Sequence, residues 1–275
     1  MEQLKDNMSI VIVSYDGYSD LWEDFFTLKD LNWGNCPYNT YLANNTKTFS
    51  HENVTVINCG IDAQWSDRAR KAIQALSTKY VCLMVEDFYI SGPVDNKLIE
   101  EALALMEKDG IKYYKLQTMT RKKTENYEGI DYLRTITSNI KYGVSLTTGI
   151  WEKEHILQLI GDESYNPWKF EAMRVLEASQ VVKPYAVVGV FDNRNVLNIC
   201  HMVVQGKYIP SSVKELEKKG YKIVNKSRKF LNSKEAFVLK AKRILYPIIR
   251  QSSIAVKLFD VLPFKSVRTR NVASL

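Results

Sequence analysis

A chain of 275 residues has the length of one large domain or two small ones. With 45% hydrophobic and 25% charged residues, its composition is that of an ordinary globular protein and excludes a disordered, collagen-like or fibrous chain. The four cysteines are far apart and the three histidines are scattered, which argues against a disulfide scaffold and a structural zinc site.

The net charge of +7 is distributed unevenly. Residues 222–275 contain thirteen Lys or Arg against two acidic residues, a net charge of +11, so the rest of the chain carries −4. This asymmetry predicts a local contact between the C-terminal segment and an anionic surface, either a membrane or a nucleic acid. We expect neither a secretory signal at the N-terminus nor a spanning helix, because no apolar run approaches about 18 residues.

The first half of the chain alternates predicted strands and helices. Ser66 is the expected N-cap of the second helix, because a serine hydroxyl can accept a hydrogen bond from an unpaired amide of the first turn. The alternation predicts an α/β fold with a parallel sheet and helices on both faces. Strands are expected at residues 8–13, 40–43, 54–58, 80–85 and 112–117, and helices at 20–31, 66–76 and 95–108.

The second half is less regular and predicts a mixed arrangement. Strands are expected at residues 143–148, 185–190 and 196–204, and helices at 152–160, 167–178 and 211–219. From Phe237 to Phe259, apolar residues fall on one side of a helical wheel and Lys and Arg on the other. This pattern predicts a basic amphipathic helix with a kink at Pro247.

Polar side chains follow two of the predicted parallel strands at their carboxyl ends. Ser14, Tyr15 and Asp16 follow the first strand, and Glu86 and Asp87 follow the strand at 80–85. In open parallel sheets ligands bind beyond these ends, where the loops diverge. We therefore expect a site there that serves a nucleobase, a diphosphate and a metal ion.

The start of the predicted helix at residue 66 adds basic and hydroxyl groups. Trp65, Ser66 and Arg68 lie where helix amides and a guanidinium group suit a diphosphate. The chain contains no G-x-x-x-x-G-K-[ST] loop, no G-x-G-x-x-G and no G-x-S-x-G. P-loop, dinucleotide-binding and serine-hydrolase interpretations therefore lose their main support.

Five segments in this order resemble bacterial capsule and cell-surface polysaccharide glycosyltransferases of the GT-A fold. The resemblance covers about residues 8–220 and implies one GT-A-like domain at 1–221, with a Rossmann-like nucleotide-sugar half at about 1–118 and an acceptor half at about 119–221. The charge distribution sets the basic segment 222–275 apart from it. The segments are SYDGYSDLWEDFF, WGNCPYNTYLANN, WSDRARKAIQAL, YVCLMVEDFYISGPVD and SLTTGIWEKEHILQLIGDESYNPWKFE.

The resemblance implies roles for the residues at the strand ends. Glu86 and Asp87 stand in the place of the D-x-D motif, whose carboxylates hold Mg²⁺ or Mn²⁺ on the diphosphate. Phe88 replaces the third residue, so a metal-independent mechanism, with Arg68 neutralising the diphosphate, stays open. The residues placed at the nucleotide are Ser14, Tyr15, Asp16, Trp65, Ser66 and Arg68.

The second half supplies candidates for the acceptor side. Glu171 lies near the start of a predicted helix, where inverting GT-A enzymes place the base that removes the acceptor proton. Glu163 and Asp162 are competing carboxylates. Other candidates are Trp151 and Trp168 for stacking on sugar rings, and His201 as a metal ligand or phosphate contact.

We therefore predict a hexosyltransferase that transfers a sugar from a nucleotide-diphosphate donor to a lipid-linked saccharide. A UDP-sugar is the first candidate donor. The basic segment 222–275 is expected to bind the inner, cytoplasmic face of the membrane rather than nucleic acid. Three alternatives stay open: a non-catalytic protein that binds nucleotide sugars or polysaccharide, a nucleic-acid-binding protein and a nucleotidyltransferase. Packing of this segment on the body, or an oligomer interface, stays open too.

Overall fold

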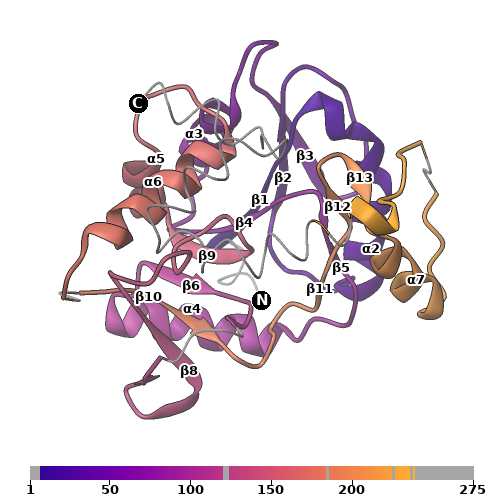
Figure 1. The fold of residues 1–275 in the computed structure, drawn as a ribbon. Helices are drawn as coiled ribbons and strands as arrows, with labels where there is room; N and C mark the ends of the chain where they lie inside the picture. The colour runs from indigo at the N-terminus through magenta and orange to yellow at the C-terminus, as the bar shows by residue number, and fades with distance from the viewer. Residues whose placement is uncertain (1–6, 120–123, 184–185, 225–226, 236–237, 239–275) are drawn as a thin grey trace.

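The centre of the molecule is a nine-stranded sheet with helices on both faces (Figure 1). The computed structural model describes residues 7–119, 124–183, 186–224, 227–235 and 238. Within these residues the strand order is β3-β2-β1-β4-β9-β6-β10-β8-β7. The predicted α/β class with a mixed central sheet is thereby confirmed.

Most strands of this sheet run in one direction. Strand β9 (Gly149–Glu152) is antiparallel to both of its neighbours, and β8 (Ile130–Thr137) is antiparallel to β10. The strands with the common direction are β1 (Met8–Val13), β2 (Thr40–Asn44), β3 (Val54–Asn58), β4 (Tyr80–Met84), β6 (Tyr113–Lys115), β7 (Asn126–Tyr127) and β10 (Val187–Asp192).

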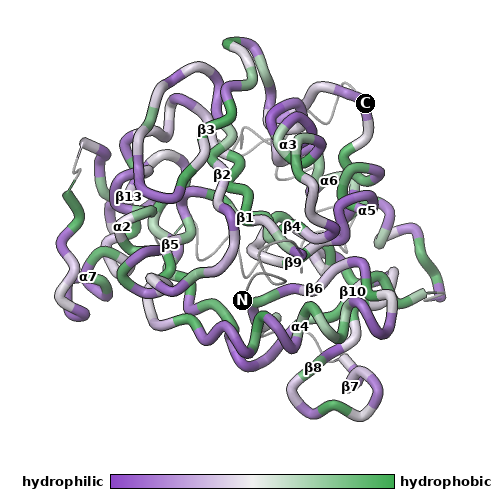
Figure 2. Tube along the Cα trace, turned by 180° about the vertical axis from the view of Figure 1, so that it is seen from behind, coloured by the Kyte–Doolittle hydropathy of each residue, from purple (hydrophilic) through white to green (hydrophobic). Residues whose placement is uncertain are grey.

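Side chains of the fully buried strand β1 alternate between two hydrophobic cores. Ile10 and Ile12 pack on one face, and Val11 and Val13 pack on the other. Figure 2 shows hydrophobic residues along the central strands and hydrophilic ones in the outer loops. Helices α2 (Trp22–Asn32), α4 (Asn96–Asp109) and α7 (Pro210–Lys218) supply the first core, and α3 (Trp65–Gln74), α5 (Lys153–Ile160) and α6 (Pro167–Gln180) supply the second.

Several local predictions differ from the structure. The helix predicted at 20–31 is preceded by a 3-10 helix, η1 (Asp16–Leu21). Ser66 is not the N-cap of α3: Gln64 holds that position, and its amide donates to Asp67 Oδ2 at 2.9 Å. The strand predicted at 143–148 is wrong, because those residues form turns and bends that lead into β9.

Two small antiparallel pairs lie beside the main sheet. Strand β5 (Phe88–Ile90) pairs with β11 (Ile199–His201), and β12 (Val203–Val204) pairs with β13 (Lys207–Tyr208). The single strand predicted at 196–204 is thus divided in two. The first pair places His201 opposite Phe88, directly after the predicted acidic motif.

The described part of the basic C-terminal segment packs on the body. The amide of Val224 donates to Asp24 Oδ1 at 2.9 Å, and the amide of Leu231 donates to the Tyr208 carbonyl at 2.9 Å. The predicted helix from Phe237 to Phe259 lies outside the described residues apart from Val238. In the part of the chain that the structure describes, no helix has both the length and the apolarity to cross a membrane.

Candidate functional site

The strand order changes direction between β1 and β4. From β1 the chain adds β2 and β3 on one side and then returns to place β4 on the other side of β1. In open parallel sheets, ligands bind beyond the carboxyl ends of the strands at such a change of direction. The loops that leave β1 and β4 carry residues 14–16 and 86–87, so the topology places both predicted polar groups at one edge.

The loop after β1 is held by its own side chains. The buried Ser14 hydroxyl accepts a hydrogen bond from Trp22 Nε1 at 2.7 Å. The Asp16 carboxylate accepts hydrogen bonds from the Thr46 hydroxyl, at 2.8 Å, and from the amide of Lys47, at 3.3 Å. Partial burial alone would raise the pKa of Asp16, but the hydrogen bonds from Thr46 and Lys47 lower it below its ordinary value. Asp16 therefore fastens this loop to the loop after β2.

Arg68 is a buried cation near the loop after β1. Its side chain is 7% exposed, one amino group donates to the Ala63 carbonyl, and Nε has no hydrogen-bond partner. The guanidinium carbon lies 5.9 Å from the ring centre of Tyr15. Burial lowers the pKa of Arg68, while the charge of Glu86 opposes this shift. A buried guanidinium with an unused donor is suited to an anionic group such as a diphosphate.

Glu86 is the buried member of the acidic pair after β4. Burial raises its pKa to about 8, and the neighbouring charge of Asp87 adds to this shift. A hydrogen bond from Ser14 and the charge of Arg68 act in the opposite direction. Glu86, in the loop after β4, therefore interacts with the loop after β1 through Ser14 and with helix α3 through Arg68.

Asp87 is more accessible and contacts His201. Asp87 Oδ2 lies 3.3 Å from His201 Nε2, and the two side chains are 23% and 43% exposed. The ring centres of Phe88 and His201 lie 4.6 Å apart. Within the described ranges, no three His, Cys, Asp or Glu side chains form a group that could hold a metal ion. Of the three residues predicted as metal ligands, Asp87 and His201 are the two whose side chains contact each other.

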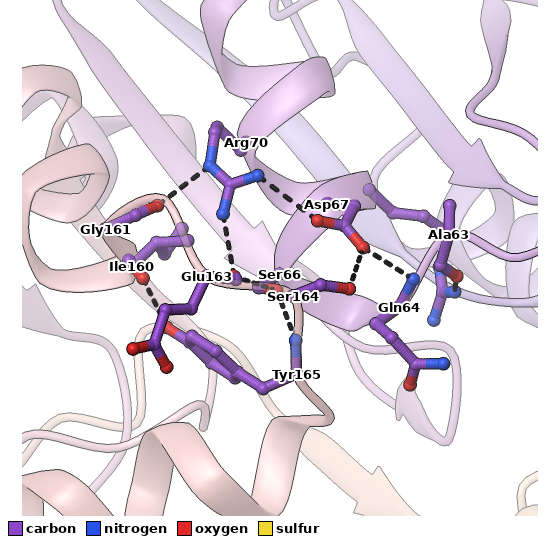
Figure 3. A network of polar contacts seen from close by, with 11 residues as sticks. Ala63, Gln64, Ser66, Asp67, Arg70, Ile160, Gly161, Glu163, Ser164 and Tyr165 are labelled. Carbon is purple, nitrogen blue, oxygen red and sulfur yellow. Dashed lines mark hydrogen bonds and ion pairs between the residues drawn. The ribbon is translucent and has the colours of Figure 1, made fainter.

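Residues at the start of α3 attach this helix to the loop before α6 (Figure 3). The Ser66 hydroxyl donates to the Glu163 carbonyl and accepts from the Tyr165 amide, both at 2.8 Å. Trp65 is 3% exposed, and its ring centre lies 5.4 Å from that of Phe170. The Ser66 hydroxyl is thus occupied by protein partners and the Trp65 ring by packing, while Trp65 Nε1 and Arg68 Nε are buried donors without a hydrogen-bond partner.

A second polar cluster lies at the carboxyl end of β6. Lys115 is 6% exposed, and its ammonium group donates to the Ser145 hydroxyl, which lies 3.0 Å from the Thr147 hydroxyl. Glu171 Oε1 accepts a weak hydrogen bond from the Leu146 amide at 3.4 Å. Burial lowers the pKa of Lys115 to about 8, and the charge of Glu171 opposes this shift. The base candidate therefore lies near a buried lysine.

The sequence analysis does not identify Lys115 as a candidate, because the run Tyr113-Tyr114-Lys115-Leu116 predicts only a strand. The available signal is a charged residue within an apolar strand, since burying a charge without a partner costs free energy.

The two acceptor tryptophans differ in accessibility. Trp151 is fully buried on β9, and its ring centre lies 3.8 Å from that of Tyr113. A fully buried ring has no face free for a sugar. Trp168 is 58% exposed in the first turn of α6, three residues before Glu171. Trp168 is therefore the tryptophan that an acceptor could reach.

No protein-family model matches this chain, and no curated protein matches it. Among solved structures, it is similar to residues 1–349 of TarS from S. aureus, with 9% identity, a TM-score of 0.43 and coverage of 68% of this chain and 60% of that one. TarS has also been solved with UDP, and that structure gives 12% identity, a TM-score of 0.40 and coverage of 68% and 60%.

A cytidylyltransferase from Leptospira borgpetersenii shows 12% identity, a TM-score of 0.42 and coverage of 82% of this chain and 99% of that one. All these TM-scores are below 0.5, so the likenesses carry no argument about activity. The chain is thus similar in structure to TarS and to a cytidylyltransferase.

Proposed function

We propose that this protein is a glycosyltransferase that uses a nucleotide-diphosphate sugar, with UDP as the first candidate nucleotide. The observation that carries the proposal is the convergence at one edge of the sheet of a buried guanidinium and two acidic side chains. Arg68 keeps an unused donor there, Glu86 interacts with it, and Asp87 pairs with His201. This set combines a cation for a diphosphate with ligands for a divalent ion.

The donor would lie across the carboxyl ends of β1 and β4. Tyr15, whose side chain is 42% exposed, offers a ring for the nucleobase, and Arg68 offers its donors to the diphosphate. Asp87 and His201 would hold Mn²⁺ or Mg²⁺, which when bound neutralises charge on the leaving diphosphate. Ser66 and Asp16 would act indirectly, because their polar groups already bind protein partners.

Glu171 is the proposed general base. In an inverting transfer its carboxylate takes the proton of an acceptor hydroxyl, whose oxygen then bonds to the anomeric carbon. The bond from that carbon to the phosphate oxygen breaks, and the nucleoside diphosphate leaves with the electron pair. The position of Glu171 supports this role, because it lies beside the loop that enters β9 at the same edge of the sheet.

The acceptor is proposed to be a saccharide on a lipid carrier at the inner face of the membrane, as in capsule synthesis. The support is the net charge of +11 in residues 222–275. Binding of the full chain to vesicles with anionic lipids, compared with neutral vesicles, tests this part separately from the chemistry.

The experiment that tests the function has two steps. Calorimetric titration with UDP, GDP, CDP and dTDP, with and without Mn²⁺, identifies the nucleotide. Incubation with the matching nucleotide sugar and a panel of saccharide acceptors then identifies the product. Release of the nucleoside diphosphate with a new glycoside supports the proposal. Release of pyrophosphate from a sugar phosphate and a nucleoside triphosphate identifies a nucleotidyltransferase, and binding without turnover indicates a non-catalytic protein.

A further inference from the structure

Arg228 belongs by sequence to the basic C-terminal segment, but its side chain contacts the 3-10 helix η1, which follows β1. Its guanidinium donates to both carboxylate oxygens of Asp20 at 2.6 Å and to the Gly17 carbonyl at 3.0 Å. It also lies 4.0 Å from the ring centre of Tyr18. The Arg228 side chain is only 11% exposed. Its charge is therefore used inside the protein and adds little to an anionic-membrane contact.

These contacts connect Arg228 to the exposed ring of Tyr15. Tyr18 lies 4.9 Å from Tyr15 between ring centres, and Tyr15 lies 5.9 Å from Arg68. We refer to Arg228, Tyr18, Tyr15 and Arg68 as the arginine–tyrosine row. Its members come from three separate parts of the chain and meet at the carboxyl edge of β1.

Gly17 allows the ring of Tyr15 to lie where it does. A Cβ atom at position 17 would be 2.4 Å from the Tyr15 ring, so the ring folds closely over this backbone. Tyr18 also lies near the acidic pair: burial raises its pKa to about 12, and the charges of Tyr15, Asp87 and Glu86 contribute. The row therefore borders the proposed nucleotide site directly.

We infer that Arg228 is a positioning residue for the nucleobase. Arg228 holds the ring of Tyr18, and Tyr18 in turn holds the exposed ring of Tyr15. This inference rests on the proposed function. Stacking of a base on an aromatic side chain contributes about 1–3 kcal/mol, which corresponds to roughly a 5- to 150-fold change in affinity. Loss of the correct ring position should remove much of that contribution and leave the diphosphate contacts intact.

The test compares UDP with inorganic pyrophosphate, which lacks the base, in calorimetric titrations at one fixed Mn²⁺ concentration. The variants are Arg228→Met and Tyr18→Leu, with Lys229→Met as the matched control. Lys229 is the neighbouring exposed cation, and its carbonyl, not its side chain, bonds to the Tyr208 amide. We expect Arg228→Met and Tyr18→Leu to weaken UDP binding about ten-fold and pyrophosphate binding less than two-fold. Lys229→Met should change neither.

Unchanged UDP binding by Arg228→Met overturns the inference, and so does an equal loss for UDP and pyrophosphate, which would indicate a phosphate contact or general damage. If Arg228→Met does not fold, the same comparison of UDP and pyrophosphate binding in Tyr18→Leu tests the inference. A wild-type protein that binds no nucleoside diphosphate removes the proposed function and this inference with it. If the wild type binds UDP and both variants bind UDP with the same affinity, the positioning role alone is overturned.

Discussion

His201 Nε2 lies 3.3 Å from Asp87 Oδ2, although the two residues are 114 positions apart in the chain. The short antiparallel pair of β5 and β11 brings them together, because it places His201 opposite Phe88. Both side chains are partly exposed. A carboxylate and an imidazole at this separation can bind one divalent ion together after the imidazole has lost its proton.

We expect Asp87→Asn and His201→Ala each to weaken Mn²⁺-dependent UDP binding at least ten-fold, because each removes one of the two proposed ligands. Calorimetric titration of UDP at several Mn²⁺ concentrations measures this. Asp62→Asn, in the exposed loop before α3, is the control and should leave binding unchanged. Equal UDP affinity in EDTA and in Mn²⁺ for the wild type would contradict the metal site.

Ser66→Ala separates a structural role from a binding role. The hydroxyl makes two hydrogen bonds to the loop at 163–165 in a fully buried position, so its loss should lower the free energy of unfolding by about 1–3 kcal/mol. Denaturant unfolding measures this change, and UDP affinity should stay the same. Ser77→Ala, at an exposed position, is the control. A loss of UDP affinity without a loss of stability would instead make Ser66 a direct nucleotide contact.

Glu171→Gln should abolish sugar transfer while largely sparing donor binding. An amide of the same size keeps the shape but cannot take a proton, and removal of a general base costs about 10²- to 10⁴-fold in rate. The transfer rate and the UDP affinity are both measured. Glu163→Gln, whose side chain is 76% exposed and pairs with Lys169, is the control. Full transfer activity in Glu171→Gln would exclude this residue as the base.

Lys115 makes stability depend on pH in a defined direction. Because burial lowers its pKa from 10.5 to about 8, the unfolded chain binds more protons between these values and the folded protein gains stability as the pH rises. A pKa change of this size corresponds to about 3 kcal/mol in the free energy of unfolding.

Denaturant unfolding at pH 7 and pH 10.5 measures this effect as the difference in free energy of unfolding between the wild type and Lys115→Met. That difference should shift by up to about 3 kcal/mol in favour of the wild type at the higher pH. The same comparison with Lys112→Met, whose side chain is 55% exposed in the wild type, should show no such shift. A pH-independent difference for Lys115→Met would mean that Lys115 titrates normally.

The parallel part of the sheet could be predicted from local pattern alone. Strands β1 and β3 have the predicted bounds, because each is an apolar run that ends at polar residues. The placement of residues 14–16 and 86–87 at one edge follows from the shared direction of β1 and β4. Helices α4, α5 and α6 lie within about two residues of their predicted bounds.

Features that depend on long-range contacts could not be predicted in this way. The pairing of β5 with β11 joins segments more than 100 residues apart, and each strand is only three residues long. The sequence placed Arg228 in a basic segment, yet its burial depends on Asp20 and Tyr18, about 210 positions away. Charge counts describe composition, whereas burial of a charge depends on the partner that tertiary structure supplies.

Strand β9 lies between β4 and β6, and it is synthesised after both of them. Until residues 149–152 emerge, β4 has no partner on that side, and its five residues are all buried in the final sheet. An apolar strand with an open edge pairs readily with other chains. Chains that end before residue 149 should therefore aggregate.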